Sequence, residues 1–167
     1  MSYKEQWILE MLVKHEATSK TLKTNTMKVK FKKLHPDAVT PTYAKAGDAG
    51  MDLTAVSSTT DEYGNAVYGT GLALEVPEGY VGLIFPRSSN SKMDLYLTNH
   101  VGVVDSGYRG EIMFKFRSTS VGIPNIYKVG ERVGQLLIIP YPQIEFVEAD
   151  ELSNTERGVG GFGSSGK

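Results

Sequence analysis

A carboxylate beside a short glycine turn is the feature of this 167-residue chain best suited to hydrolytic chemistry. Asp105 follows the apolar stretch 101–104 and precedes a Ser-Gly turn, which places it at the rim of an apolar strand. A carboxylate in that position is a candidate general base that activates a water molecule. The alternative is an ordinary hairpin, in which Asp105 accepts hydrogen bonds from N–H groups of its own turn.

A second carboxylate, Asp52, lies among small residues in the stretch 46–53. Hydrated Mg²⁺ keeps several of its waters and uses few carboxylates, so Asp52 is a candidate holder of metal-bound water. Taken alone, a turn aspartate that bonds its own backbone is the simpler interpretation.

Polar side chains suited to phosphate gather in residues 87–92, which hold one arginine, three serines and one lysine. Arginine and lysine bind phosphate well, although a solvated polar loop explains this stretch about equally. Asn99 carries both a donor and an acceptor, which reading a base edge requires. Tyr108 is suited to packing against a sugar. Gln135 is a single amide in an apolar strand, where facing solvent is the alternative to binding a ligand.

Glycine-rich residues 151–167 form an arm that cannot bury enough apolar surface to order itself alone. The arm carries one cation, Arg157, and one aromatic, Phe162, so it is suited to closing over a ligand. Residues 158–163 satisfy the GxGxxG pattern and residues 161–167 the GxxxxGK pattern. We reject both motifs, because each needs an adjoining strand and helix that this sequence does not predict.

Short alternating apolar runs between Met27 and about Asp150 must position these residues. Apolar residues alternate over 72–76 and 112–116, and residues 133–139 are apolar up to Pro140. Glycine and proline interrupt the runs at short intervals. This pattern predicts an antiparallel β-barrel or sandwich, with a short helix or loop within residues 90–97.

The first 26 residues differ in pattern from the rest. Apolar and aromatic residues there recur at helical spacing: Trp7, Ile8, Met11, Leu12 and His15. Threonine-rich residues 18–26 then predict a linker, so we expect a short helix appended to a domain that begins near Met27. A frayed tail is the alternative, and contact with an unidentified protein partner or a neighbouring subunit is a further hypothesis.

Composition excludes several function classes. The net charge is −1, with 18 basic and 19 acidic residues and no basic stripe, so we expect no nucleic-acid partner. No apolar run approaches the length of a membrane span and no signal peptide is evident, which predicts a protein that is not secreted and is cytoplasmic, or nuclear if eukaryotic. The absence of cysteine excludes disulfides, thiolate nucleophiles and cysteine-bound metals.

Five stretches together resemble the five ordered motifs of the homotrimeric dUTPases, the deoxyuridine triphosphate nucleotidohydrolases. They are residues 46–53, 85–92, 97–112, 130–137 and 157–166. The resemblance covers roughly residues 27–167. It differs from the family pattern in Met51, which stands where tyrosine is frequent, in a phosphate stretch one residue shorter than in many members, and in Ser165 as the last serine or threonine.

The resemblance implies an all-β fold, an antiparallel jelly-roll-like β-barrel over residues 27–150. The short N-terminal helix would lie in residues 1–26 and the flexible glycine-rich C-terminal arm in residues 151–167. Active sites of the family form at subunit junctions. The resemblance therefore also implies a homotrimer with three shared sites, in which each arm closes over a neighbouring site.

The activity that the resemblance implies is hydrolysis of dUTP to dUMP and pyrophosphate with Mg²⁺, which would cleanse the nucleotide pool and supply the precursor of dTTP. Asp105 would activate the water that attacks the α-phosphorus, and Asp52 would hold waters of the metal. The substrate-binding residues would be Arg87, Ser88, Ser89, Asn99, Val104, Tyr108, Gln135, Arg157, Phe162, Gly163, Ser164 and Ser165.

Within that set, the resemblance divides the work by part of the nucleotide. Asn99 and the hairpin backbone would read uracil, with Tyr108 under the sugar. The α- and β-phosphates would go to Arg87, Ser88 and Gln135. The arm would bind the γ-phosphate through Arg157, Ser164 and Ser165 and cover uracil with Phe162.

Two other functions compete with this hypothesis. A dCTP deaminase on the same fold would need a catalytic glutamate beside the base-reading hairpin. A regulatory protein that uses nucleotide binding as a signal is the other rival, with the N-terminal extension as its contact surface.

Overall fold

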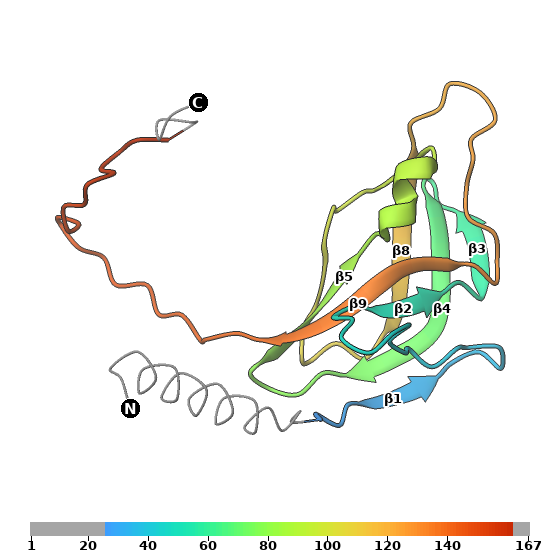
Figure 1. Ribbon diagram of the computed structural model, residues 1–167, viewed down its shortest axis with the longest axis horizontal. Helices are drawn as coiled ribbons and strands as arrows, with labels where there is room; N and C mark the ends of the chain where they lie inside the picture. Colours follow the sequence, from blue (N-terminus) through green and yellow to red (C-terminus); the bar gives the residue numbers. More distant parts are fainter. Residues whose placement is uncertain (1–25, 162–167) are drawn as a thin grey trace, which may run out of the picture.

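Two antiparallel sheets make up most of the regular structure of residues 26–161, the part of the chain that this computed structural model describes (Figure 1). The first sheet has the order β1-β4-β8-β6, with β3 also paired to β4. Its strands are β1 (Lys30–Lys33), β3 (Ser57–Thr60), β4 (Ala66–Glu75), β6 (Leu95–Leu97) and β8 (Glu111–Ser118). The second sheet has the order β2-β9-β5-β7. Its strands are β2 (Met51–Thr54), β5 (Tyr80–Phe85), β7 (Gly102–Val104) and β9 (Arg132–Pro140).

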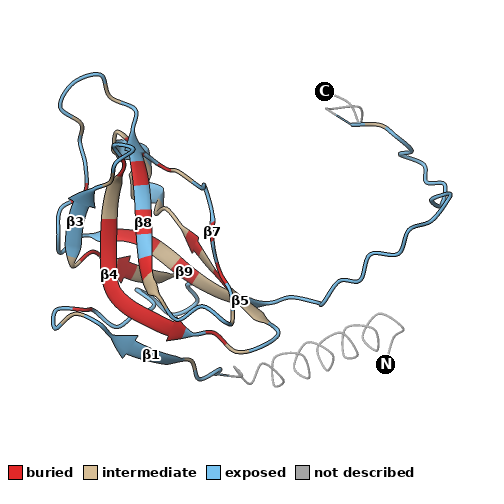
Figure 2. Ribbon diagram, turned by 180° about the vertical axis from the view of Figure 1, so that it is seen from behind, coloured by how far each residue is buried: buried red, intermediate tan, exposed pale blue. Residues whose placement is uncertain are grey.

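Alternating side chains build the core between the sheets. In β8, Ile112, Phe114 and Phe116 are buried while the residues between them are exposed, as a strand with one face in the core requires. β4 is buried along most of its length, and the buried stripes of β4 and β8 lie side by side in Figure 2. The predicted all-β antiparallel fold is confirmed.

β4 contains an irregularity that the core accommodates with hydrogen bonds. The register against β8 shifts between Gly69 and Ala73, and Gly71 has φ +65°, a conformation that favours glycine. Glu111 accepts a bond from the Gly71 N–H at 2.7 Å, and buried Thr70 donates to the Ile112 carbonyl at 2.7 Å. The displaced backbone is thus bonded rather than left unpaired.

The stretch 90–97 contains the end of a short helix, as one of the two expectations had it, and also a strand that was not predicted. A 3₁₀ helix, η1 (Ser88–Lys92), follows β5, and β6 begins three residues later. Beyond β9, residues 141–161 run away from the two sheets (Figure 1). No helix among the described residues is long and apolar enough to cross a membrane. The helix expected within residues 1–26 and the arm residues 162–167 lie outside the described residues, so those expectations remain predictions.

Candidate active site

Strand pairing in the second sheet gathers three of the predicted polar side chains, Asp52, Arg87 and Gln135, around one cavity of about 310 Å³. Asp52 on β2 lies opposite Gln135 on β9, and Gln135 lies opposite Phe85 on β5, two residues before Arg87. We call this the arginine cavity. Its lining residues are Ala44, Asp48, Ala49, Gly50, Asp52, Arg87, Arg132 and Gln135.

Asp52 is the centre of the arginine cavity. Its Oδ1 accepts a hydrogen bond from Arg87 Nε at 2.9 Å, and its Oδ2 accepts one from Arg132 Nη1 at 2.8 Å. The Asp52 side chain is 12% exposed, so a mostly buried carboxylate meets two guanidinium groups, of which Arg87 is the more buried. The net charge of this trio is positive, which suits a phosphate chain at the mouth of the cavity.

The turn-aspartate interpretation is wrong for Asp52, although Asp48, four residues earlier, bonds the backbone of its own turn. Asp48 Oδ2 accepts a bond from the Lys45 backbone N–H at 2.8 Å, three residues away. Both Asp52 oxygens instead bond side chains from distant segments. Each carboxylate oxygen has two acceptor sites, so Asp52 retains one per oxygen for metal-bound water. The free acceptor sites of Asp52 therefore fit a hydrated Mg²⁺, whose bound waters would donate hydrogen bonds to the carboxylate.

Arg132 is a functional candidate that sequence reasoning missed. Strict alternation along β9 would turn Arg132 and Gln135 to opposite faces, because they are three residues apart. The pairing of β2 with β9 is irregular, since Leu53 lies opposite Gly134 and Thr54 lies opposite Arg132. A bulge of this kind changes the phase of the strand and brings Arg132 to the cavity that Gln135 lines. Its only sequence signal was its place in the stretch 130–137.

A second cavity, of about 400 Å³, lies against the hairpin that carries Asp105. We call it the hairpin cavity. Its lining residues are Ile84, Thr98, Asn99, Gly102, Val103, Val104, Asp105, Tyr108, Glu111, Ile112, Met113 and Lys115. The structure therefore brings together three predicted substrate contacts, Asn99, Val104 and Tyr108, with the predicted general base. Val104 is buried, whereas Asn99 and Asp105 are exposed.

Side chains brace the turn that carries Asp105. The Tyr108 N–H donates to the Asp105 carbonyl at 3.1 Å, and the Tyr108 hydroxyl donates to the Glu111 carbonyl at 3.0 Å. Arg109 Nη1 donates to the carbonyls of Ser106 and Tyr108 at 2.6 and 2.8 Å. Gly110 has no side chain, and a Cβ there would overlap the Tyr108 ring. The exposed carboxylate thus stands on a rigid turn.

The two cavities lie far apart within one chain. Asp52 is level with Phe85 across the second sheet, whereas Val104 is level with Gly82, and Asp105 follows Val104. Three strand spacings of about 4.8 Å and a rise of about four residues along the strands separate the two carboxylates by on the order of 20 Å. A water activated by Asp105 therefore cannot attack a phosphate in the arginine cavity of the same chain.

The remaining predicted site residues lie elsewhere. Ser89 accepts a bond from Arg87 Nη1 at 3.3 Å, and Ser88 is exposed at the start of η1. Arg157 lies far along the segment that leaves the sheets and donates from Nε to the Gly160 carbonyl at 2.9 Å. Four predicted contacts lie outside the described residues: Phe162, Gly163, Ser164 and Ser165.

Two antiparallel sheets, with a cavity in which two arginines flank one aspartate and a separate carboxylate hairpin, define an all-β protein equipped for an anionic ligand. The dUTPase family model matches residues 37–166, which include both cavities, and the chain belongs to this family of hydrolases.

Relatives and solved structures agree with this assignment. The chain is 41% identical over 143 residues to the deoxyuridine 5′-triphosphate nucleotidohydrolase of Thermobifida fusca, covering 84% of this chain and 80% of the relative. It is 43% identical over 143 residues to the enzyme of that name from a Hydrogenobaculum species, covering 84% and 99%. The dUTPase of Staphylococcus bacteriophage 80alpha with dUpNHpp aligns with a TM-score of 0.69 and 30% identity, covering 85% of this chain and all of that one.

Proposed function

We propose that this protein hydrolyses dUTP to dUMP and pyrophosphate, removing dUTP from the nucleotide pool and supplying the precursor of dTTP. The observation that carries the proposal is the family match over residues 37–166, which contains the Asp52–arginine trio and the Asp105 hairpin. Relatives about 40% identical are named for this reaction.

The arginine cavity is assigned to the phosphate chain. Arg87, Arg132 and Gln135 supply donors, and the hydroxyls of Ser88 and Ser89 lie on the adjoining 3₁₀ helix. Asp52 would hold Mg²⁺ through its waters, and that cation, when bound, neutralises charge on the phosphate oxygens. A structure of another phage dUTPase, from phi11 of S. aureus, is described as showing a structural Mg(II) ion.

The hairpin cavity is assigned to the deoxyuridine. Asn99 presents an amide to the base edge, Val104 closes the floor, and the Tyr108 ring packs against the sugar. Cytosine exchanges a donor and an acceptor at this edge, so it would leave groups unpaired at a cost of about 1–3 kcal/mol each. Asp105 accepts a proton from the water that attacks the α-phosphorus.

A complete site then requires more than one copy of the chain, and we propose a homotrimer. The hairpin cavity of one subunit must face the arginine cavity of another, because the two are on the order of 20 Å apart within one chain. The segment carrying Arg157 runs away from its own sheets (Figure 1), which would let it reach a neighbouring subunit. Arg157, with Ser164 and Ser165, would bind the γ-phosphate there, and Phe162 with Gly163 would cover the base.

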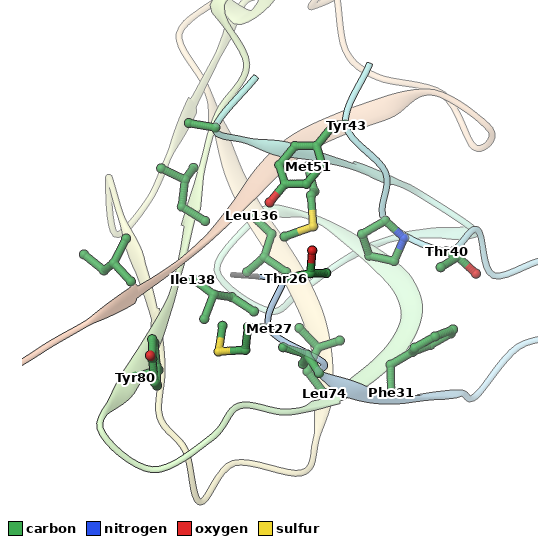
Figure 3. Close-up of a pocket in the computed structure, with 15 residues that line it drawn as sticks. Thr26, Met27, Phe31, Thr40, Tyr43, Met51, Leu74, Tyr80, Leu136 and Ile138 are labelled. Atoms are coloured by element: carbon green, nitrogen blue, oxygen red, sulfur yellow. The ribbon is translucent and has the colours of Figure 1, made fainter. Parts of the chain in front are cut away.

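An apolar groove of about 730 Å³ supplies a place for the neighbour's arm (Figure 3). Met51 of β2 and Ile138 of β9 point into it, and Phe31 of β1 lies at its edge (Figure 3). Residues 143–148, which lead from β9 into the arm, alternate in polarity up to Phe146, and Phe146 is 95% exposed on its own subunit. The same stretch is acidic, whereas residues 28–33 beside the groove contain four lysines. Apolar contact and charge thus favour an arm from a second copy.

The oligomeric state is tested by light scattering on the protein as it elutes from a size-exclusion column. We expect a trimer for the native chain, and dissociation for Phe146→Asp, because a charge would enter the apolar groove. Val121→Asp is the matched control, since Val121 is fully exposed in the β8–β9 loop, away from the arm. A Phe146→Asp protein that remains trimeric would show that the segment carrying Phe146 does not hold the trimer together.

Product analysis tests the activity. The protein is incubated with dUTP and Mg²⁺ and the products are separated, with dCTP, dTTP and UTP as parallel substrates. We expect dUMP and pyrophosphate from dUTP alone. Asp105→Asn should lower kcat by about 10²- to 10⁴-fold while dUpNHpp still binds, because a general base contributes to the reaction step. Near-normal kcat in Asp105→Asn would exclude this residue as the base.

Deamination of dCTP is the rival reaction, and it needs a glutamate beside the base. Glu111 lines the hairpin cavity, but its Oε1 accepts the Gly71 N–H at 2.7 Å and so is committed to the β4 irregularity. This contact favours a structural role for Glu111. Ammonia release from dCTP would reverse the assignment.

A further inference from the structure

We infer that the buried hydroxyl of Tyr127 is a positioning group for the phosphate-binding 3₁₀ helix η1, acting through Asn90. The inference rests on the proposed function, in that η1 and Arg87 are assigned to the phosphate chain. Tyr127 lies in the loop between β8 and β9 and is 6% exposed.

Tyr127 is held from behind by aromatic packing. Its ring centroid lies 5.6 Å from that of Phe116 and 6.0 Å from that of Tyr68, the latter in an edge-to-face arrangement. The Tyr68 hydroxyl donates to the Tyr127 carbonyl at 3.0 Å. Ring and backbone are therefore both anchored in the core, and the hydroxyl emerges at a defined place.

That hydroxyl bonds the residue at the centre of η1. Tyr127 Oη donates to Asn90 Oδ1 at 3.1 Å, and Asn90 Nδ2 donates to the Leu95 carbonyl at 2.8 Å. The Asn90 backbone completes the turn, because its N–H donates to the Arg87 carbonyl and its carbonyl accepts the Met93 N–H, both at 2.9 Å. Asn90 thus joins the core tyrosine, through its side chain, to the carbonyl of Arg87, through its backbone N–H.

A second set of hydrogen bonds joins the β8–β9 loop to the C-terminal end of η1. Asn125 Nδ2 donates to the Lys92 carbonyl at 2.9 Å, and the Asn125 N–H donates to Asp94 Oδ2 at 2.7 Å. The Asp94 N–H returns a bond to the Asn125 carbonyl at 3.0 Å. Residues 125–127 therefore hold both the middle and the end of η1 against the barrel.

The tyrosine remains a donor at ordinary pH. Burial raises the pKa of Tyr127, against smaller opposing effects of the Ser89 hydroxyl and the Arg87 charge. The bond to Asn90, three residues after Arg87, places the hydroxyl close behind the residues assigned to phosphate. The loop residues do not line the arginine cavity, so their influence on a ligand must pass through η1.

Binding of two nucleotides separates positioning from general loosening. Tyr127→Phe keeps the ring and removes only the hydroxyl. We expect affinity for dUpNHpp to weaken about three- to tenfold, as the loss of one net hydrogen bond allows, and affinity for dUMP, which presents one phosphate instead of three, to weaken less. Kinetically, KM for dUTP should rise more than kcat falls, since no reacting group is altered.

Two further variants make the result decisive. Tyr68→Phe removes another hydroxyl from the same aromatic cluster, leaves the Tyr127–Asn90 bond in place, and should change the ratio of dUpNHpp to dUMP affinity less than Tyr127→Phe does. Asn90→Ala should lower dUpNHpp affinity, and adding Tyr127→Phe to it should cause no further loss, because the link is already broken.

An unchanged ratio in Tyr127→Phe, an equal shift in Tyr68→Phe, or additive losses in the double variant would each overturn the inference. Failure of the native protein to hydrolyse dUTP would instead refute the proposed function, so the two failures are distinguishable.

Discussion

Replacing Asp52 by asparagine removes the charge that holds two arginines together. At an effective dielectric constant of about 20, two unit charges about 4 Å apart attract by about 4 kcal/mol. Arg132 is 52% exposed, so solvent screening reduces its share to at most about 1 kcal/mol. Arg87 is 22% exposed and its charged hydrogen bond contributes about 1.5–3 kcal/mol. Because asparagine retains one acceptor oxygen, we expect Asp52→Asn to lower the free energy of unfolding by about 2 kcal/mol.

Urea denaturation at several protein concentrations measures this loss and separates it from subunit dissociation. Asp48→Asn is the matched control, since Asp48 lines the same cavity but bonds only the nearby Lys45 N–H. It should cost less than about 1 kcal/mol. A loss below about 0.5 kcal/mol in Asp52→Asn, or equal losses in both variants, would refute the view of Asp52 as the charge that organises the cavity.

Three other expectations follow from the described contacts. Gly134→Ala should lower the free energy of unfolding by about 1–3 kcal/mol in thermal or urea melts, because its Cβ would overlap the Phe114 ring and lie 2.9 Å from the Phe85 carbonyl oxygen. Hydrogen bonds from the Asn65 side chain and backbone lower the pKa of Asp61 from 3.8 to about 2, so its stabilisation is present above pH 3.8 and lost as pH falls toward 2. Stability of Asp61→Asn, followed by circular dichroism, should depend less on pH in that window; an unchanged acid transition would contradict this. Truncation after Glu156 should abolish dUTP turnover, because it removes the arm residues assigned to the substrate, and should leave the trimer intact by light scattering. A truncated protein that is monomeric would contradict an arm that is separable from the assembly.

The alternation of apolar and polar residues allowed the strands to be predicted from the sequence. Alternation around Ile112 and Phe114 predicted β8, because a strand with one buried face must place apolar residues at every second position. The chemistry of Asp105 and Arg87 was also visible, since a carboxylate at a strand end and an arginine in a serine-rich turn are local features. These judgements needed no knowledge of which strands pair.

Pairing and register decided what the sequence left open. Only the β2–β9–β5 register shows that Asp52 meets two arginines rather than its own turn, and only the irregularity at Thr54 brings Arg132 to the cavity. The wide separation of the Asp105 hairpin from that cavity is likewise a property of strand order. Side-chain type and local spacing can be taken directly from the sequence, whereas contacts between distant segments depend on which strands pair and in which register. The sequence therefore determined which residues can do chemistry, and the tertiary structure decided which of them can act together within one subunit.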